Sequence, residues 1–141
     1  MKIAICSSMF FAKDIMEVKC ELEKIGHEVF MPKNTELYAN GSLIAETRQE
    51  STKNKIRDNL LRKYFSIIES ADAVLVINKE KNGIKNYVGG NSFLEMGFAH
   101  ILNKPIYLLH EIPEMGYKDE IMAMSPIILM GDISKIYHQT A

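Results

Sequence analysis

A carboxylate and a glycine pair stand close together in one segment, and together they could form a catalytic site. Glu95 follows the pair Gly89–Gly90, with Asn91 directly after them. Two glycines allow a backbone to approach a ligand closely, or else to make a tight turn. A helical period places Glu95 beside the small residue Ala99, at the edge of an inner face. A partly desolvated carboxylate in such a cleft can act as a nucleophile or as a base.

The helix that carries Glu95 leaves other interpretations open. Ser92 and Glu95 have the spacing of a capping box, in which the glutamate would only fold back on the serine. The residues expected to pack on a sheet are Leu94, Phe98, Ile101 and Leu102. The opposite side, with Phe93, Met96 and His100, is also mostly apolar, and a helix that is apolar all round is usually buried on every side. A homodimer contact or cover by a long loop would explain this pattern equally well.

Strand and helix signals alternate along the chain. Short β-branched and apolar runs predict strands, and the predicted strands are Lys2–Cys6, His27–Met31, Ala73–Asn78, Ile106–Leu109 and Pro126–Met130. Apolar positions three or four residues apart predict helices over Phe10–Ile25, Ser51–Ser70, Ser92–Leu102 and Asp119–Met124. The polar stretch Asn34–Glu46 is expected to be a loop. This order predicts one α/β domain over residues 1–141, a doubly wound, flavodoxin- or Rossmann-like fold with a parallel sheet of about five strands.

Ligands of open parallel sheets bind beyond the carboxyl ends of the strands. Three loops leave those ends, and the candidate binding residues on the first two are Ser7, Ser8, Met9, Asn78, Gly89, Gly90 and Asn91. Ser7 and Ser8 could donate to an anion, or they could merely cap the following helix. The third loop contains His110 and Tyr117, whose roles are undecided, as is that of Asp132. Neither a dinucleotide fingerprint nor a phosphate-binding P-loop motif is present, so we expect no nucleotide cofactor.

Composition narrows the class of protein further. The 141 residues carry 17 basic and 18 acidic side chains, a formal net charge of -1, without the basic surplus of a nucleic-acid-binding protein. No apolar run reaches the length of a membrane helix, and no secretory signal is visible. Cys6 and Cys20 are expected to be reduced and buried in a cytoplasmic protein. The four histidines are widely spaced, so no catalytic metal is expected.

The residues around Glu95 resemble the nucleoside 2-deoxyribosyltransferase-like superfamily, which includes the nucleoside 5′-monophosphate N-glycosidases. The resemblance rests on the strand Ala71–Ile77, a glycine-containing loop, Glu95-Met96-Gly97-Phe98-Ala99, and then Lys104-Pro105-Ile106. It implies that Glu95 attacks the anomeric carbon of a nucleoside or nucleotide and forms a glycosyl-enzyme intermediate. It also implies that Ser7, Ser8 and Met9 hold the sugar or its phosphate, together with the start of the glutamate's helix. Homodimers or larger homo-oligomers are implied too, with the region Pro113–Met124 as a lid.

The sequence departs from this superfamily at positions that matter for catalysis. Relatives carry an acidic residue six positions before the nucleophile, where Gly89 stands here, or in the preceding helix, where Tyr64 stands. The remaining candidates for an acid that protonates the leaving base are Asp58, Asp72 and Asp119. The first loop also lacks the glycine and arginine that are common in phosphate-using members.

Three hypotheses follow from the sequence. The leading one is an enzyme that cleaves or transfers the N-glycosidic bond of a nucleoside or nucleotide, with Glu95 as nucleophile. The alternative is a catalytically inactive nucleotide-binding sensor with the same fold. A purely structural dimerising domain is the third.

Overall fold

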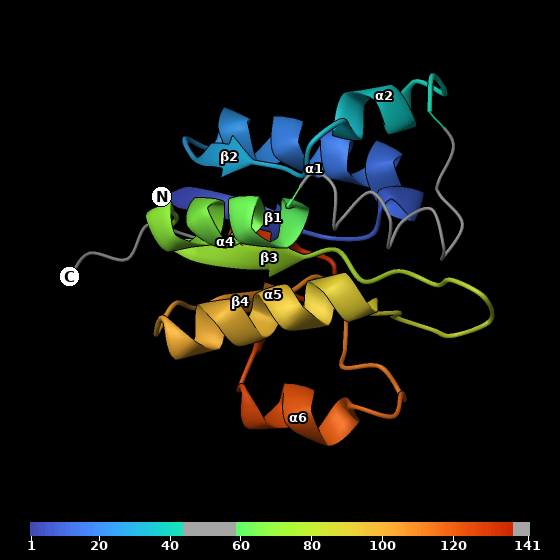
Figure 1. The fold of residues 1–141 in the computed structure, drawn as a ribbon, viewed down its shortest axis with the longest axis vertical. Coiled ribbons are helices and arrows are strands. Elements are labelled where there is room, and N and C mark those ends of the chain that lie inside the picture. The colour runs from blue at the N-terminus through green and yellow to red at the C-terminus, as the bar shows by residue number, and fades with distance from the viewer. Residues whose placement is uncertain (44–58, 137–141) are drawn as a thin grey trace.

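The computed structural model describes residues 1–43 and 59–136, and its centre is a parallel sheet. The strands are β1 (Lys2–Cys6), β2 (Glu28–Phe30), β3 (Ala73–Val76), β4 (Ile106–Leu108) and β5 (Ile127–Ile128). All neighbouring strands are parallel, in the order β2-β1-β3-β4-β5 (Figure 1). The predicted α/β fold with a five-stranded parallel sheet is therefore confirmed.

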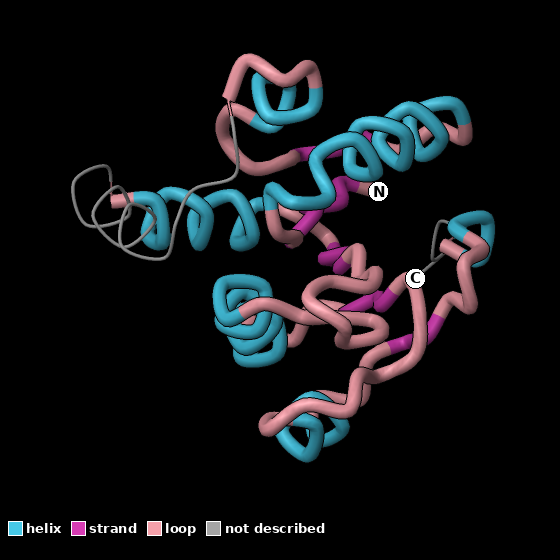
Figure 2. Tube along the Cα trace, turned by 90° about the vertical axis from the view of Figure 1, so that its right-hand side faces the viewer, coloured by secondary structure: helices cyan, strands magenta, loops and turns pink. Residues whose placement is uncertain are grey.

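Helices cover both faces of this sheet, as the tube view shows (Figure 2). Alternate residues of each strand point to opposite faces. Ala4, Cys6, Val74 and Val76 share a core with α4 (Leu60–Ser70), α5 (Gly90–Ile101) and α6 (Lys118–Ala123). The intervening residues of the same strands pack against α1 (Ala12–Lys24) on the other face. The predicted doubly wound arrangement is thus present.

The helix boundaries follow local chemistry. The short 3₁₀ helix η1 (Met9–Phe11) leads into α1 and is capped by the Ser8 hydroxyl, which accepts a hydrogen bond from the Phe10 amide at 3.2 Å. After α1, Gly26 has φ +97°, a conformation that ends a helix and favours glycine. The second 3₁₀ helix, η2 (Ile133–Lys135), was not expected from the sequence.

Two predicted segments differ from the structure. The expected loop Asn34–Glu46 contains a five-residue helix, α2 (Thr35–Ala39), which is too short to show a helical period. Of the expected helix Ser51–Ser70, only the part from Leu60 onward is confirmed, because residues 51–58 lie outside the described residues. Asn59 has φ +55°, a left-handed conformation that is incompatible with a helix running through it.

None of the helices in residues 1–43 and 59–136 combines the length and apolar character that crossing a bilayer requires.

Candidate functional site

The strand order creates a natural binding edge. The chain continues from β1 to β2 on one side of the sheet, and from β3 to β4 and β5 on the other side. Where the direction reverses, between β1 and β3, a crevice forms outside the carboxyl ends of these two strands. Cys6 and Val76 are paired at that edge. The strand arrowheads in Figure 1 point toward it, and the loops 7–9 and 77–89 leave from it.

Glu95 reaches this edge from α5. The helix begins at Gly90 with Gly89 as its N-cap residue, so Glu95 lies in the second turn. Its side chain belongs to the buried face of α5 and is only 8% exposed. The capping-box interpretation is wrong, because Ser92 is the third residue of the helix rather than its cap and is itself buried. A carboxylate that lies on the inner face of a helix needs another explanation.

The inner face of α5 is not the one that the sequence predicted. The buried residues are Ser92, Glu95, Met96 and Ala99, whereas Leu94 is 47% and Ile101 is 78% exposed. Periodicity could not separate the two faces because both carry large apolar side chains. Glu95 therefore lies on the sheet-facing side itself, rather than at its edge.

Beneath Glu95 lie a thiol and a phenol. Cys6, at the end of β1, is fully buried, and its thiol forms a hydrogen bond with the Glu95 carboxylate. Burial raises the pKa of this thiol well above its usual range, and the Glu95 charge and hydrogen bond raise it further. Burial likewise raises the pKa of Tyr64, with smaller contributions from Cys6 and Glu95. Both groups therefore stay protonated beside the carboxylate.

Tyr64 also completes the sheet at this point. Its hydroxyl donates a hydrogen bond to the carbonyl oxygen of Ile5. The pairing between β1 and β2 ends with Ala4 and Phe30, so Ile5 lies just beyond the last residue that β2 matches. Tyr64 thereby fixes the end of β1 under Glu95.

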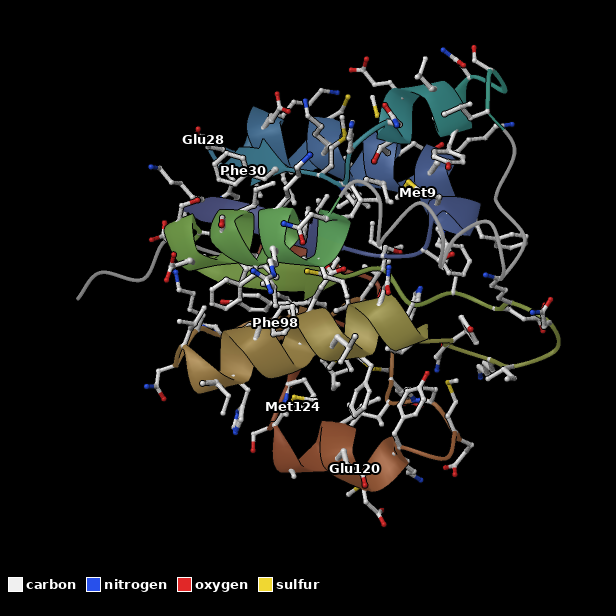
Figure 3. All side chains as sticks on the ribbon, viewed as in Figure 1. Met9, Glu28, Phe30, Phe98, Glu120 and Met124 are labelled. Carbon is white, nitrogen blue, oxygen red and sulfur yellow. The ribbon has the colours of Figure 1, made fainter. Side chains whose placement is uncertain are left out.

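The first loop places its two serines differently. The Ser7 hydroxyl donates to the carbonyl of Ile77 at 2.9 Å and so ties β1 to the end of β3. The Ser8 hydroxyl accepts from the Phe10 amide and from Lys81 Nζ, the latter at 3.3 Å. Met9 accepts a weak hydrogen bond from Thr35 through its sulfur and is the first residue of η1, just before α1 (Figure 3). Among Ser7, Ser8 and Met9, Ser8 is the residue whose side chain contacts a charged group, the Lys81 amine.

Asn78 connects two loops rather than facing a cleft. It is fully buried, and its amide nitrogen donates to the carbonyls of His110 at 3.1 Å and Glu111 at 3.0 Å. Its oxygen accepts from the His110 amide at 2.9 Å. These bonds use the polar groups of the Asn78 side chain, so it holds the third loop in place and does not present them to a substrate.

The third loop and the segment after it pack onto the start of α5. The Tyr117 hydroxyl donates to the carbonyl of Val88, and its ring stacks on Phe93 with 4.4 Å between the centroids. Burial, and then the neighbouring Tyr87, raise the pKa of Tyr117. The region Pro113–Met124, predicted as a lid, is thus bound to both sides of Gly89 and Gly90.

Of the candidate acids, the structure describes Asp72 and Asp119. Asp72 precedes β3 and accepts from the Lys2 amide at 2.7 Å, so it lies at the amino edge of the sheet. Asp119 is exposed in the first turn of α6, and Asp58 lies outside the described residues. Asp132 is also exposed, and its hydrogen bonds with Ser134 lower its pKa. His110 has a lowered pKa because of burial and then the charges of Lys79 and Lys85.

Three features at this edge were not singled out from the sequence: the Cys6 contact with Glu95, the cation Lys81, and Tyr87 beside Gly89. Asn82-Gly83 was a usable signal, since this dipeptide favours a tight hairpin. The structure has that hairpin, with Lys81 and Ile84 paired across it. Cys20, expected to be buried, is exposed, because it lies off the apolar stripe of α1. Within the part of the chain that the structure describes, no cluster of histidine, cysteine and acidic residues could hold a metal ion.

Comparison with known proteins supports the fold. No family model and no curated protein matches the sequence. The structure is similar to that of a 2-deoxyribosyltransferase from the psychrotolerant bacterium Bacillus psychrosaccharolyticus, a biocatalyst for nucleoside synthesis. The TM-score is 0.53 and the identity 22%, over 77% of this chain and 71% of that one.

A CMP N-glycosidase from Clostridium botulinum is similar with a TM-score of 0.49 and 16% identity, over 91% of this chain and 85% of that one. The similarity to the 2-deoxyribosyltransferase supports the α/β fold of this chain.

Proposed function

We propose that this protein cleaves or transfers the N-glycosidic bond of a nucleoside or nucleotide, with Glu95 as the nucleophile. The observation that supports this most is the burial of the Glu95 carboxylate at the β1–β3 edge, on a helix whose capping it does not serve. Burying a carboxylate lowers the free energy of unfolding unless the group is hydrogen-bonded. Buried carboxylates are therefore concentrated at functional sites. The similarity to a 2-deoxyribosyltransferase fold agrees with this assignment.

The site suits attack on an oxocarbenium-like sugar. As the bond to the base breaks, positive charge develops at the anomeric carbon, and a carboxylate in a water-poor site stabilises that charge strongly. The Cys6 thiol, kept protonated by burial, contacts the carboxylate without competing for the sugar, and the Tyr64 phenol fixes the end of β1 beneath it. Water or a second base would then release the sugar from Glu95.

The test is release of free base from a panel of nucleosides and nucleoside monophosphates, followed by chromatography. Glu95→Gln keeps the shape of the side chain but removes its nucleophilic charge, so we expect at least about a thousandfold lower rate. Glu114→Gln is the matched control, because Glu114 is an exposed carboxylate paired with Lys118 on the surface. Base release by wild type that survives in Glu95→Gln would disprove the assignment.

A nucleotide-binding sensor without turnover is the second candidate. It is favoured by the positions of Asp72 and Asp119, neither of which lies where it could protonate a leaving base at Glu95. A sensor would show a higher melting temperature with a nucleotide and no released base after prolonged incubation.

We further propose a homodimer that forms through the outer face of α5. An apolar groove is lined by Met124, which directly follows α6, and by residues at helical spacing on α5: Leu94, Gly97, Phe98 and Ile101. Figure 3 shows Met124 between α5 and α6. Exposed apolar stripes of this kind mark association surfaces, and Gly97 lets a second helix approach closely.

We also propose the cytoplasm as the compartment. The cysteines Cys6 and Cys20 are both free, and the proposed substrates are small intracellular metabolites.

A further inference from the structure

A hairpin over residues 79–88 brings lysines to the edge where Glu95 lies. Asn82 and Gly83 have φ values of +53° and +76°, the conformation of a tight two-residue turn. The backbone of Lys81 and Ile84 is paired on either side of this turn, and the Tyr87 amide donates to the carbonyl of Lys79 at 2.9 Å. The position of Lys81 is therefore fixed by backbone bonds rather than by its own side chain.

The three lysines of the hairpin have different surroundings. Lys79 forms an ion pair with Asp14 at 2.6 Å, and Lys85 is exposed. Lys81 is half-buried, and its Nζ lies 5.3 Å from the ring centroids of both Phe10 and Tyr87. It pairs with no carboxylate among residues 1–43 and 59–136. Its polar contact there is the Ser8 hydroxyl at 3.3 Å. Two aromatic faces thus hold a cation that no described acid neutralises.

Ser8 offers a second donor at the same place. Its oxygen accepts from both Lys81 and the Phe10 amide, which leaves its own proton for a further acceptor. Ser7 differs in this respect, because its proton is used on the Ile77 carbonyl. The two serines, which the sequence could not distinguish, therefore have separate roles.

The Tyr87 ring lies between the Lys81 amine and the start of α5. Tyr87 contacts Lys81, and a Cβ added to Gly89 would lie 3.4 Å from the same ring. Gly90 and Asn91 are the first residues of α5, a helix of 12 residues, and its N-cap residue Gly89 makes no side-chain hydrogen bond to the first amides. A lysine and a hydroxyl that contact each other, with the start of α5 beside Tyr87, form a set of hydrogen-bond donors. A phosphate group matches such a set through charge-assisted hydrogen bonds.

We propose that Lys81 is a specificity-determining residue that recognises a phosphate on the sugar, so that the substrate is a nucleoside monophosphate rather than a nucleoside. This inference rests on the proposed function for the place of the sugar at Glu95. Here a lysine on the hairpin supplies the cation that the first loop lacks, since that loop contains no arginine or lysine before Lys13.

The test is calorimetric titration of the Glu95→Gln protein, which binds ligand without consuming it. The probes are 5′- and 3′-monophosphates of the common nucleosides and the unphosphorylated nucleosides themselves. We expect the preferred monophosphate to bind at least about tenfold more tightly than its nucleoside, the usual size of one charge-assisted contact. Lys81→Met in this background keeps the aliphatic stem between the two rings and should remove that preference. Lys85→Met loses the same charge from an exposed position of the same hairpin, and this variant should retain the preference for the monophosphate.

Two results would overturn the inference. One is equal affinity for monophosphate and nucleoside, and the other is a phosphate preference that persists in Lys81→Met. A melting temperature for Lys81→Met close to that of Lys85→Met excludes a merely structural effect. Because binding is measured without turnover, failure of the proposed function shows separately, as absence of base release by the wild-type protein.

Discussion

Glu95 and Cys6 lie in contact at the end of β1, and each changes what the other can do. The charge of the carboxylate and a hydrogen bond with it help to keep the thiol protonated, and the thiol also donates to the Ala4 carbonyl at 3.9 Å. A thiol is a weak donor, so it orients a carboxylate without taking much of its charge. Cys6 is therefore a positioning residue, and its chemistry should be that of an inert buried side chain.

The first prediction concerns this thiol. With Ellman's reagent near pH 8.5, about the ordinary pKa of a cysteine, one thiol should react quickly and one slowly. Cys20 is exposed and supplies the fast reaction, whereas burial raises the Cys6 pKa and blocks access. Cys20→Ser should remove the fast phase, and denaturant should make Cys6 reactive. A fast phase that remains in Cys20→Ser would contradict the described position of Cys6.

The second prediction concerns Asn78. Asn78→Ala removes three buried hydrogen bonds to the backbone of His110 and Glu111. Buried backbone groups left without partners cost about 1–3 kcal/mol each, so we expect a loss of about 2–4 kcal/mol after partial rehydration. Urea unfolding measures this as a lower midpoint with an unchanged slope.

Asn40→Ala is its control, because Asn40 is exposed and accepts one bond from the Ser42 amide. It should cost less than about 1 kcal/mol. Equal losses in the two variants would show that Asn78 does not hold the third loop.

Among the elements, α5 and the hairpin before it place the site. The helix provides Glu95 from its buried face, and the hairpin covers its N-terminus with Tyr87. Each of these two elements contains a glycine, but only the hairpin requires one for its backbone conformation. Gly83 has φ +76° in the turn, whereas Gly97 is an ordinary helical residue, and open space surrounds the Cβ position of both.

The third prediction is a pair of substitutions with opposite signs. In the dissociated monomer, Gly97→Ala should raise the free energy of unfolding by about 0.5–1 kcal/mol, because alanine restricts the unfolded chain and favours a helix. Gly83→Ala should lower it by about 1 kcal/mol, because an L side chain is strained at positive φ. Chemical denaturation of both variants measures the difference. A stabilising Gly83→Ala would mean that the turn does not have the described conformation.

Most of the strands and helices could be predicted from the sequence. The β1 boundaries and the approximate positions of the other strands follow from short apolar runs and the residues that end them. The inner face of α5 could not be predicted, because Leu94 and Met96 are equally apolar and only the sheet decides between them. The contact between Cys6 and Glu95 joins residues far apart in the chain, and no spacing signals it. The dipeptide Asn82-Gly83 indicates the hairpin. Nothing in the neighbouring sequence distinguishes Lys81 from the other lysines of the hairpin, because its contacts with Phe10 and Ser8 come from a distant part of the chain.

In the whole molecule, one face remains apolar after folding. Ile101 is 78% exposed on the outer side of α5, next to the groove between α5 and α6. The formal net charge of -1 provides little repulsion between copies. A second copy of the chain is the partner that we propose for this face.

The fourth prediction follows from that proposal. Ile101→Glu places a charge on the most exposed residue of the apolar stripe and should convert dimers to monomers in light scattering coupled to gel filtration. Ile25→Glu is the control, because Ile25 is 47% exposed at the end of α1, away from the groove. A wild-type protein that is monomeric at high concentration would disprove the dimer.

The central claim, that Glu95 bonds to the sugar, is tested most directly by trapping the intermediate. A substrate with fluorine at C2′ slows the oxocarbenium-like release step, so the glycosyl-enzyme accumulates. Mass spectrometry of the digested protein should show the sugar on the peptide that contains Glu95, and no adduct in Glu95→Gln. A sugar attached to any other residue, or base release from an efficiently processed substrate with no adduct at all, would contradict the account.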